Sequence, residues 1–241
     1  MNKIKHEITD EELVSEVNLE EGSEKRKIVI PGETIVSGGD FLPGEGTRRE
    51  GEDVVAERYG LAEKIGRVVK IISLSGAFIP RRGNVILGVV TDINHRGWVL
   101  DIDYAGSAFM PVTEAPRFIQ KGEFDTFLAI GDVVAAKIWE VNGISIDLTI
   151  KGRGLGKLEG GFVFRINSSR VPRVIGKEGS MINLIKEKTG CQITVGQNGW
   201  VWVKGNNLDA EIKARKGIEY ISEKVYVDGL TEKMEEWFGK Q

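Results

Sequence analysis

Short apolar runs separated by turn residues occupy the middle of the chain. Residues 84–111 contain three β-rich apolar runs. Residues 131–150 contain two more, joined at Asn142 and Gly143, and an Asn-Gly pair between alternating apolar runs is a strong hairpin signal. Five short strands with an interruption after the third predict a five-stranded OB barrel over residues 83–152.

The apolar spacing after Gly161 mixes strand and helix periods. The pattern predicts a strand at GFVFRI, helices at SSRVPRVI and SMINLIKEKTG, a hairpin at CQITVGQNGWVWVKG and an amphipathic helix at NLDAEIKARKGIEYISEKV. The sequence GKEG separates the first two helices, and a helix–GxxG–helix arrangement of this kind predicts a KH domain with C-terminal helices over residues 153–241. The residues expected to end the second helix, to turn the hairpin and to bury the last helix are, in that order, Gly190, Asn198 with Gly199, and Ile212, Ile218 and Ile221.

The N-terminal part differs from the rest of the chain in composition and in its pattern of apolar residues. Residues 1–27 are acidic with few apolar residues and predict a flexible arm. Residues 28–82 contain short apolar runs cut by Gly and Pro, which predicts a small β-rich domain suited to docking. The predicted fold class is therefore mixed β and α+β, with several domains.

Charge is unevenly distributed between these segments. The whole chain has a net charge of −3, the wrong sign for a nucleic-acid binder. Residues 151–205, however, carry 10 Lys and Arg against 3 Asp and Glu, a net of +7, whereas residues 1–60 carry 8 against 15, a net of −7. This partition predicts an anionic partner for the basic segment, and a basic solvated face is the alternative.

Composition excludes several classes of protein. The chain has no apolar run long enough for a membrane span and no signal-peptide core at its start, so it is expected to be cytoplasmic. A single cysteine, Cys191, cannot form an internal disulfide, and with only His6 and His95 beside it a zinc site is not expected. The sequence predicts no cofactor.

The GKEG loop is the clearest candidate site. Gly176 and Gly179 allow a tight turn and close approach of a phosphate, which the amides of the next helix attract, and Lys177 at the tip can pair with it. Glu178 at the tip repels phosphate, so a KH scaffold that no longer binds tightly is the alternative. The basic residues expected near this loop are Arg170, Arg173, Lys186 and Lys188.

Two other phosphate-binding readings of this loop fail. A Walker-A loop requires GxxxxGK[ST], and Gly179 is followed by Ser180 without the lysine. A dinucleotide fingerprint follows a strand directly, and here a helix precedes the loop.

OB barrels bind single strands by stacking bases on aromatic side chains while basic residues follow the backbone. The candidates for such a face are His95, Arg96, Trp98, Phe109 and Lys137. Trp98 and Phe109 have an alternative role in the barrel core. Lys151 and Arg153 in the linker are weaker RNA-binding candidates.

A catalytic alternative rests on acidic residues. Asp101 and Asp103 would share a face of one strand, with Asp92 nearby, and a metal-dependent nuclease needs clustered carboxylates. On a small barrel such a pair also fits a solvated strand end. The sequence predicts no enzyme.

The stretches described above resemble a known family. Residues 84–150 resemble an S1-type RNA-binding barrel, and residues 151–205 resemble the KH part of archaeal exosome RNA-binding cap subunits, the ribosomal RNA-processing protein four family. The stretch VIPGETIVSGGDFLPGEGT fits that family's β-rich first domain, so the resemblance covers roughly residues 28–238 and includes domain order.

The resemblance implies a non-catalytic subunit that binds single-stranded RNA. Three copies would sit on a hexameric ring of RNase PH-like exosome subunits and feed RNA 3′ end first to phosphorolytic sites for degradation and processing. Glu178 departs from the basic or neutral residues common in RNA-gripping KH loops. The alternative is a free-standing S1/KH transcription or translation factor.

Overall fold

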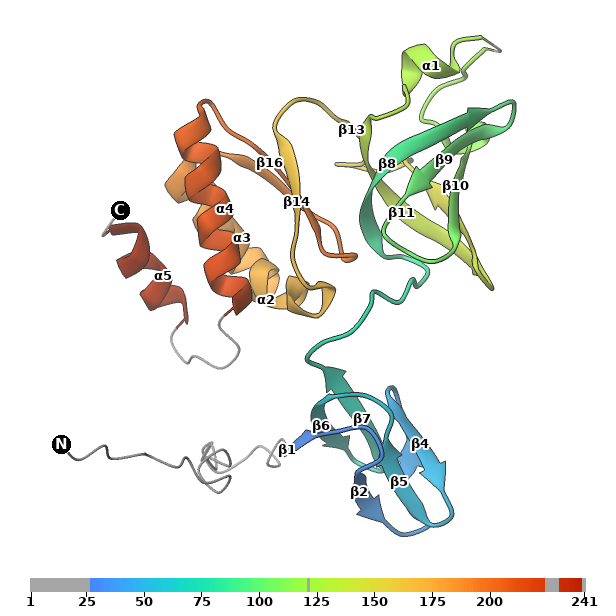
Figure 1. Ribbon diagram of the computed structural model, residues 1–241, viewed down its shortest axis with the longest axis vertical. Coiled ribbons are helices and arrows are strands. Elements are labelled where there is room, and N and C mark those ends of the chain that lie inside the picture. The colour runs from blue at the N-terminus through green and yellow to red at the C-terminus, as the bar shows by residue number, and fades with distance from the viewer. Residues whose placement is uncertain (1–26, 121, 224–229, 240–241) are drawn as a thin grey trace, which may run out of the picture. The chain divides into compact units, whose positions relative to one another are not determined.

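The computed structural model describes residues 27–120, 122–223 and 230–239 (Figure 1). The described residues divide into two compact units, one ending at Ser73 and the other beginning at Leu74. Apart from Lys27, the predicted acidic arm lies outside the described residues. Within the described residues, no helix has the length and apolar character needed to cross a membrane.

The first unit consists of two small sheets, as the β-rich pattern predicted. One has the order β1-β6-β7-β3 and the other the order β2-β5-β4. The strands are β1 (Lys27–Val29), β2 (Thr34–Ser37), β3 (Leu42–Pro43), β4 (Thr47–Glu50), β5 (Asp53–Ala56), β6 (Gly60–Ile65) and β7 (Val68–Ser73). Their core contains Val29, Ala56, Ala62 and Ile71. A Cβ at Gly60 would lie 2.4 Å from the carbonyl oxygen of Ile72, so only glycine lets these two strands approach.

The second unit begins with the predicted five-stranded barrel. Its order is β12-β10-β9-β8-β11, and pairing of β12 with β11 closes it. All its strand pairs are antiparallel except β10 with β12. The strands are β8 (Val85–Asn94), β9 (Gly97–Asp101), β10 (Ser107–Pro111), β11 (Val133–Asn142) and β12 (Ser145–Thr149). The 3₁₀ turn Val112–Glu114 and helix α1 (Phe124–Phe127) interrupt the barrel after β10, where the sequence predicted an irregular stretch.

One strand extends the barrel sheet beyond the predicted barrel. β13 (Gly156–Leu158), in the segment assigned by pattern to the KH domain, pairs with β11 through Val133 and Leu158. Residues 74–82, assigned by pattern to the first domain, fall in the second unit. The polypeptide therefore passes from the barrel into the KH fold along the barrel's own sheet.

The KH fold has the predicted order of elements. Its elements are β14 (Phe162–Arg165), α2 (Val171–Ile175), α3 (Ser180–Thr189), β15 (Gln192–Val195), β16 (Trp200–Lys204), α4 (Leu208–Glu223) and α5 (Leu230–Gly239). Gly190 ends α3 in the left-handed conformation, as predicted, and its amide donates to the Lys186 carbonyl at 2.8 Å. Ile218 and Ile221 are buried as predicted, but Ile212 is exposed, because the buried stripe of α4 runs through Ala214 and Gly217.

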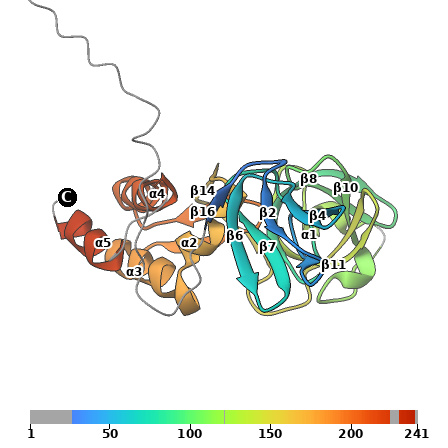
Figure 2. The same ribbon diagram turned by 90° about the horizontal axis from the view of Figure 1, so that it is seen from below.

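The three-stranded KH sheet, with the order β14-β16-β15, lies between the KH helices and the barrel (Figures 1 and 2). Val201 and Val203 of β16 face the helices and join their core. Trp200 and Trp202 face the other way and pack with Leu87 and Ala135 of the barrel strands. Alternate residues of one strand thus serve two cores, which joins the barrel and the KH fold.

A buried asparagine adds hydrogen bonds to this junction. Asn198, in the turn before β16, donates through Nδ2 to the carbonyl oxygens of Leu87 and Ile102 at 2.8 and 2.9 Å. Its Oδ1 accepts from the Leu87 amide at 3.2 Å. The predicted hairpin turn is therefore also a contact between the KH fold and the barrel.

Candidate nucleic-acid interface

The GKEG loop turns the chain from α2 into α3 through three residues with positive φ. Gly176, Glu178 and Gly179 have φ of 75°, 54° and 80°. A Cβ at Gly176 would lie 2.8 Å from both the backbone nitrogen and the Cβ of Met181, so space as well as conformation requires glycine there. At Gly179 the nearest atom to such a Cβ would be 3.5 Å away, so conformation alone favours glycine.

Beyond the loop, α3 begins at Ser180, whose amide donates to the Lys177 carbonyl, and the Gly179 amide donates to the Gly176 carbonyl at 3.2 Å. The helix dipole adds partial positive charge at this end of α3. The first turn of α3 contains no acidic residue. Lys177 is exposed at the loop tip. The helix dipole and the exposed lysine together are suited to binding a phosphate.

Glu178 is the one acidic side chain at the tip, and it is exposed. Solvent and salt screen an exposed charge, so its repulsion of a phosphate is weaker than that of a buried carboxylate. Glu178 forms no ion pair among the described residues.

The structure brings only some of the predicted basic residues to the loop. Arg170 ends the 3₁₀ turn before α2 and Arg173 lies in α2, both half-buried. Lys186 and Lys188 lie in the last turn of α3, about 9–12 Å along the helix from its first residue at 1.5 Å per residue. They therefore belong to a different part of the surface.

The predicted barrel face is not one surface. His95 and Arg96 are exposed in the turn between β8 and β9. Lys137 is exposed on β11 and pairs with Val85, at the other end of β8. The nine-residue step from Val85 to Asn94 spans about 30 Å of extended strand. The grouping of Lys137 with His95 and Arg96 was wrong, because the strand register places them at opposite ends of the barrel.

Trp98 lies in the barrel core and not on an RNA-binding face. Its side chain is 0% exposed. Nε1 donates to the carbonyl oxygens of Phe124 and Leu128 at 3.2 and 3.0 Å, and the ring contacts Phe124 and Phe127. The stacking role was wrong because helix α1 covers this side of β9. Phe109 points the other way: it is partly exposed between the buried Ala108 and Met110.

An exposed aromatic that the sequence did not single out lies in the stretch between β10 and α1. Phe118 is 86% exposed, although its neighbours Ala115 and Ile119 are buried in the barrel core. The stretch that carries it begins beside the β8–β9 turn, where the Val112 amide donates to the Arg96 carbonyl at 2.9 Å. The signal in the sequence was the aperiodic segment after the third strand, in which Phe118 follows Arg117.

The linker residues differ in their surroundings. Lys151 is exposed, and its Nζ lies 3.5 Å from Oε1 of Glu114. Arg153 is exposed in the turn that follows β12. Both remain free to meet an anion in solvent, Lys151 with its charge partly offset by Glu114.

The acidic residues considered for catalysis serve local structure. Asp101 accepts from the Asp103 amide at 2.8 Å, and Asp92 accepts from the Ile93 amide at 2.9 Å. Asp103 forms an ion pair with Arg165 at 3.1 Å. Among the described residues, no group of three or more His, Cys, Asp or Glu could hold a metal ion.

Comparison with known proteins places this architecture in a family. A KH-domain family model matches residues 161–209. The Rrp4 exosome component of Thermococcus kodakarensis is 39% identical over 218 residues, which cover 88% of this chain and 84% of that protein. The Rrp4 component of Nitrosopumilus maritimus is 35% identical over 223 residues, covering 91% of this chain and 98% of that protein. The chain belongs to the Rrp4 family of exosome components. The resemblance inferred from the barrel and KH motifs is thereby confirmed.

A solved structure extends the likeness of this Rrp4-family chain to three dimensions. The crystal structure of a protein named as an exosome complex RNA-binding protein superposes with a TM-score of 0.61 at 30% identity. The match covers 68% of this chain and 97% of that one. It agrees with the mixed β and α+β fold class predicted from the sequence.

Proposed function

We propose that the chain is a non-catalytic RNA-binding cap subunit of an exosome in the cytoplasm. It captures single-stranded RNA and passes the 3′ end to phosphorolytic sites in a hexameric ring of RNase PH-like subunits, for 3′-to-5′ degradation and processing. Three copies sit on one ring. The observation that carries the proposal is the GKEG loop at the start of α3, in a chain whose relatives are named exosome components.

Charge and exposed residues support RNA as the ligand. The segment that holds the loop has 10 Lys and Arg against 3 Asp and Glu. The rim of the barrel presents His95 and Arg96 to solvent, with the exposed ring of Phe118 on the stretch that begins beside Arg96. Backbone contacts at the KH loop and base stacking at the barrel rim together fit the recognition of a single strand.

Replacing Lys177 with glutamate is expected to weaken binding of single-stranded RNA several-fold. The change removes one phosphate contact, so the slope of log affinity against log salt concentration should fall in magnitude by about 1. Fluorescence anisotropy with a labelled oligoribonucleotide, titrated at several salt concentrations, measures both quantities.

Lys188→Glu is the matched control for this experiment. Lys188 is also exposed but lies in the last turn of α3, away from the loop, so the variant has the same charge change without a loop contact. An unchanged salt slope in Lys177→Glu would remove Lys177 from the binding site. Equal losses in both variants would indicate a general effect of charge.

The outer face of the sheet β1-β6-β7-β3 supports docking on a protein partner. The register aligns two apolar rows on this face, Ile28–Leu61–Ile72 and Ile65–Val68–Leu42. Between them lies the ion pair of Glu63 and Lys70, at 3.0 Å. Ile65 and Leu42 are each 55% exposed. Adjacent exposed apolar side chains on one sheet face are typical of a protein interface.

The double variant Ile65→Glu, Leu42→Glu is expected to lose assembly with the ring while keeping its affinity for RNA. Both changes place charge on the apolar face and leave the core of the unit untouched. Size-exclusion chromatography with light scattering, on the chain mixed with ring subunits, measures the complex and its stoichiometry. Ile144→Glu, at an exposed isoleucine on the barrel, is the control.

The same mixture separates the proposal from a free-standing RNA-binding factor, which would elute as a monomer apart from the ring. A second assay addresses catalysis by the chain itself. The purified chain, incubated with labelled poly(A) and Mg²⁺, Mn²⁺ or phosphate, is expected to leave the RNA intact. Degradation by the chain alone, retained through further purification, would refute the non-catalytic role.

A further inference from the structure

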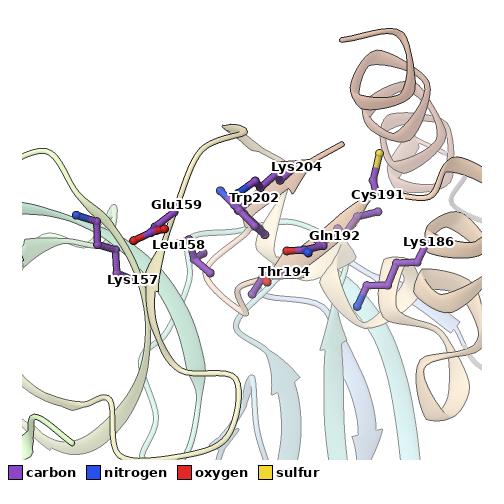
Figure 3. Close-up of a pocket in the computed structure, with 10 residues that line it drawn as sticks. Lys157, Leu158, Glu159, Lys186, Cys191, Gln192, Thr194, Trp202 and Lys204 are labelled. Carbon is purple, nitrogen blue, oxygen red and sulfur yellow. The ribbon is translucent and has the colours of Figure 1, made fainter. Parts of the chain in front are cut away.

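A groove of about 550 Å³ lies where the strand that leaves the barrel meets the KH sheet (Figure 3). Residues 157–159 of the β13 segment form one wall, and β15, β16 and the end of α3 form the rest. Residues 176–179 do not line it. The groove is therefore a separate feature from the KH loop and uses elements of both the barrel sheet and the KH fold.

Lysines dominate the charge of this groove. Lys157, Lys186 and Lys204 line it, against one carboxylate, that of Glu159. Lys157 is already paired, with its Nζ 2.6 Å from Oδ2 of Asp132. Among the described residues, Lys186 and Lys204 form no ion pair. These two lysines leave the groove with positive charge available to a ligand.

The floor of the groove is held in place by a buried tryptophan. Trp202 is 5% exposed, and its Nε1 donates to the Gly160 carbonyl at 2.8 Å. The end of the Lys204 side chain lies beside Gly160, within about 3.5 Å of where a Cβ would be at that position. Trp202 thus holds Gly160, which follows the groove wall of residues 157–159, against the KH sheet. The Lys204 side chain lies beside this glycine.

Neutral polar side chains lie beside the lysines. Gln192 pairs with Lys204 and Thr194 with Trp202 in the antiparallel register, so all four side chains project from the same face of the sheet. Gln192 and Thr194 offer donors and acceptors next to the positive charge, as Figure 3 shows. The Trp202 ring is too buried to stack on a base.

We propose that this groove binds the sugar-phosphate backbone of single-stranded RNA, as a second contact beyond the KH loop. The inference rests on the proposed function and extends the RNA path across the junction of barrel and KH fold. Two unpaired lysines with neutral donors between them match the groups that contact phosphate and sugar oxygens. Without an exposed aromatic in the groove, the contact is independent of base sequence.

The double variant Lys186→Gln, Lys204→Gln tests this site on the full chain. For single-stranded RNA of about 15 nucleotides, the affinity should fall roughly 10-fold and the salt slope by about 1.5, since each lysine contributes between about 0.7 and 1. For an oligomer of about four nucleotides, the length that a KH loop clamps, the affinity should be unchanged. Anisotropy titrations with both lengths measure the difference.

The control is the double variant Lys188→Gln, Lys216→Gln, which removes two exposed lysines from α3 and α4 outside the groove. Loss of affinity in Lys177→Glu but not in the groove variant would overturn the second site and leave the proposed function standing. Failure of the wild-type chain to bind either RNA would refute the proposed function itself.

An acidic peptide is the other candidate ligand. The positive charge of the groove would attract it, and its backbone could pair with β15, which is an edge strand. A poly-glutamate peptide titrated into the same variants distinguishes the two. If the groove variant loses the peptide but keeps its affinity for the long RNA, the RNA site is refuted. If it loses RNA affinity while the wild-type chain does not bind the peptide, the proposed occupant stands.

Discussion

Replacing Trp98 with alanine is expected to lower the free energy of unfolding by about 3–5 kcal/mol, the range for large-to-small changes at buried tryptophans. The side chain is fully buried, and its ring lies 5.4 Å from that of Phe124 and 5.5 Å from that of Phe127. The variant leaves a cavity between β9 and α1. Urea unfolding followed by circular dichroism measures the loss.

Trp98→Phe separates packing from hydrogen bonding at the same position. Phenylalanine keeps an aromatic ring but cannot donate to the carbonyl oxygens of Phe124 and Leu128. Loss of the hydrogen bonds should cost about 1–3 kcal/mol, and the smaller ring adds a packing loss to this. If Trp98→Ala unfolded at the same urea concentration as the wild-type chain, the ring would not be part of the core.

Phe118→Ala is the matched surface variant. Because the Phe118 side chain is 86% exposed, the free energy of unfolding of this variant should stay within about 0.5 kcal/mol of that of the wild-type chain. If Phe118 stacks on a base, the variant should lose about 1–3 kcal/mol of binding free energy for single-stranded RNA. The two substitutions should therefore affect different properties: Trp98→Ala lowers stability, and Phe118→Ala lowers RNA affinity.

The features that the sequence predicted well depend on local backbone conformation. The Asn142 and Gly143 turn, the GKEG loop and the Gly190 helix end each require positive φ. Glycine tolerates this conformation best, so each of these positions can be recognised in the sequence from a single residue. Because the residues between these signals keep regular apolar periods, the order of the barrel and KH elements follows from the sequence. The chemistry of the loop follows from the same residues.

The features that the sequence could not predict depend on contacts between distant residues. Trp98 and Val99 are neighbouring apolar residues of β9, and only the tertiary packing shows that Trp98 is the one that faces the barrel core and α1. The separation of Lys137 from Arg96 depends on the register of β8 with β11, and the basic groove exists only because β13 pairs with the barrel. No local pattern encodes these pairings.

Asn198 shows both kinds of information in one residue. Its place in an Asn-Gly turn can be predicted from the sequence. Its three hydrogen bonds to Leu87 and Ile102, more than ninety residues away, cannot be predicted in this way. Asn198→Ala leaves two carbonyl oxygens and one amide without partners at a buried junction. Because each unsatisfied buried group costs about 1–3 kcal/mol and water can replace some of the lost bonds, we expect a total loss of about 2–4 kcal/mol.

The Asn198 variant should also loosen the junction between the barrel and the KH fold. Hydrogen exchange, read separately for β8 and β16, is expected to rise in both strands, and urea unfolding is expected to broaden as the two cores separate. Gln197→Ala is the matched control, because the Gln197 side chain is exposed and its amide still donates to the Val85 carbonyl in the variant. Asn198→Asp sharpens the test: a carboxylate would face the carbonyl oxygens of Leu87 and Ile102, so at neutral pH this variant should lose at least as much stability as the alanine variant. Retention of wild-type stability by Asn198→Asp would show that the side-chain amide does not hold this junction.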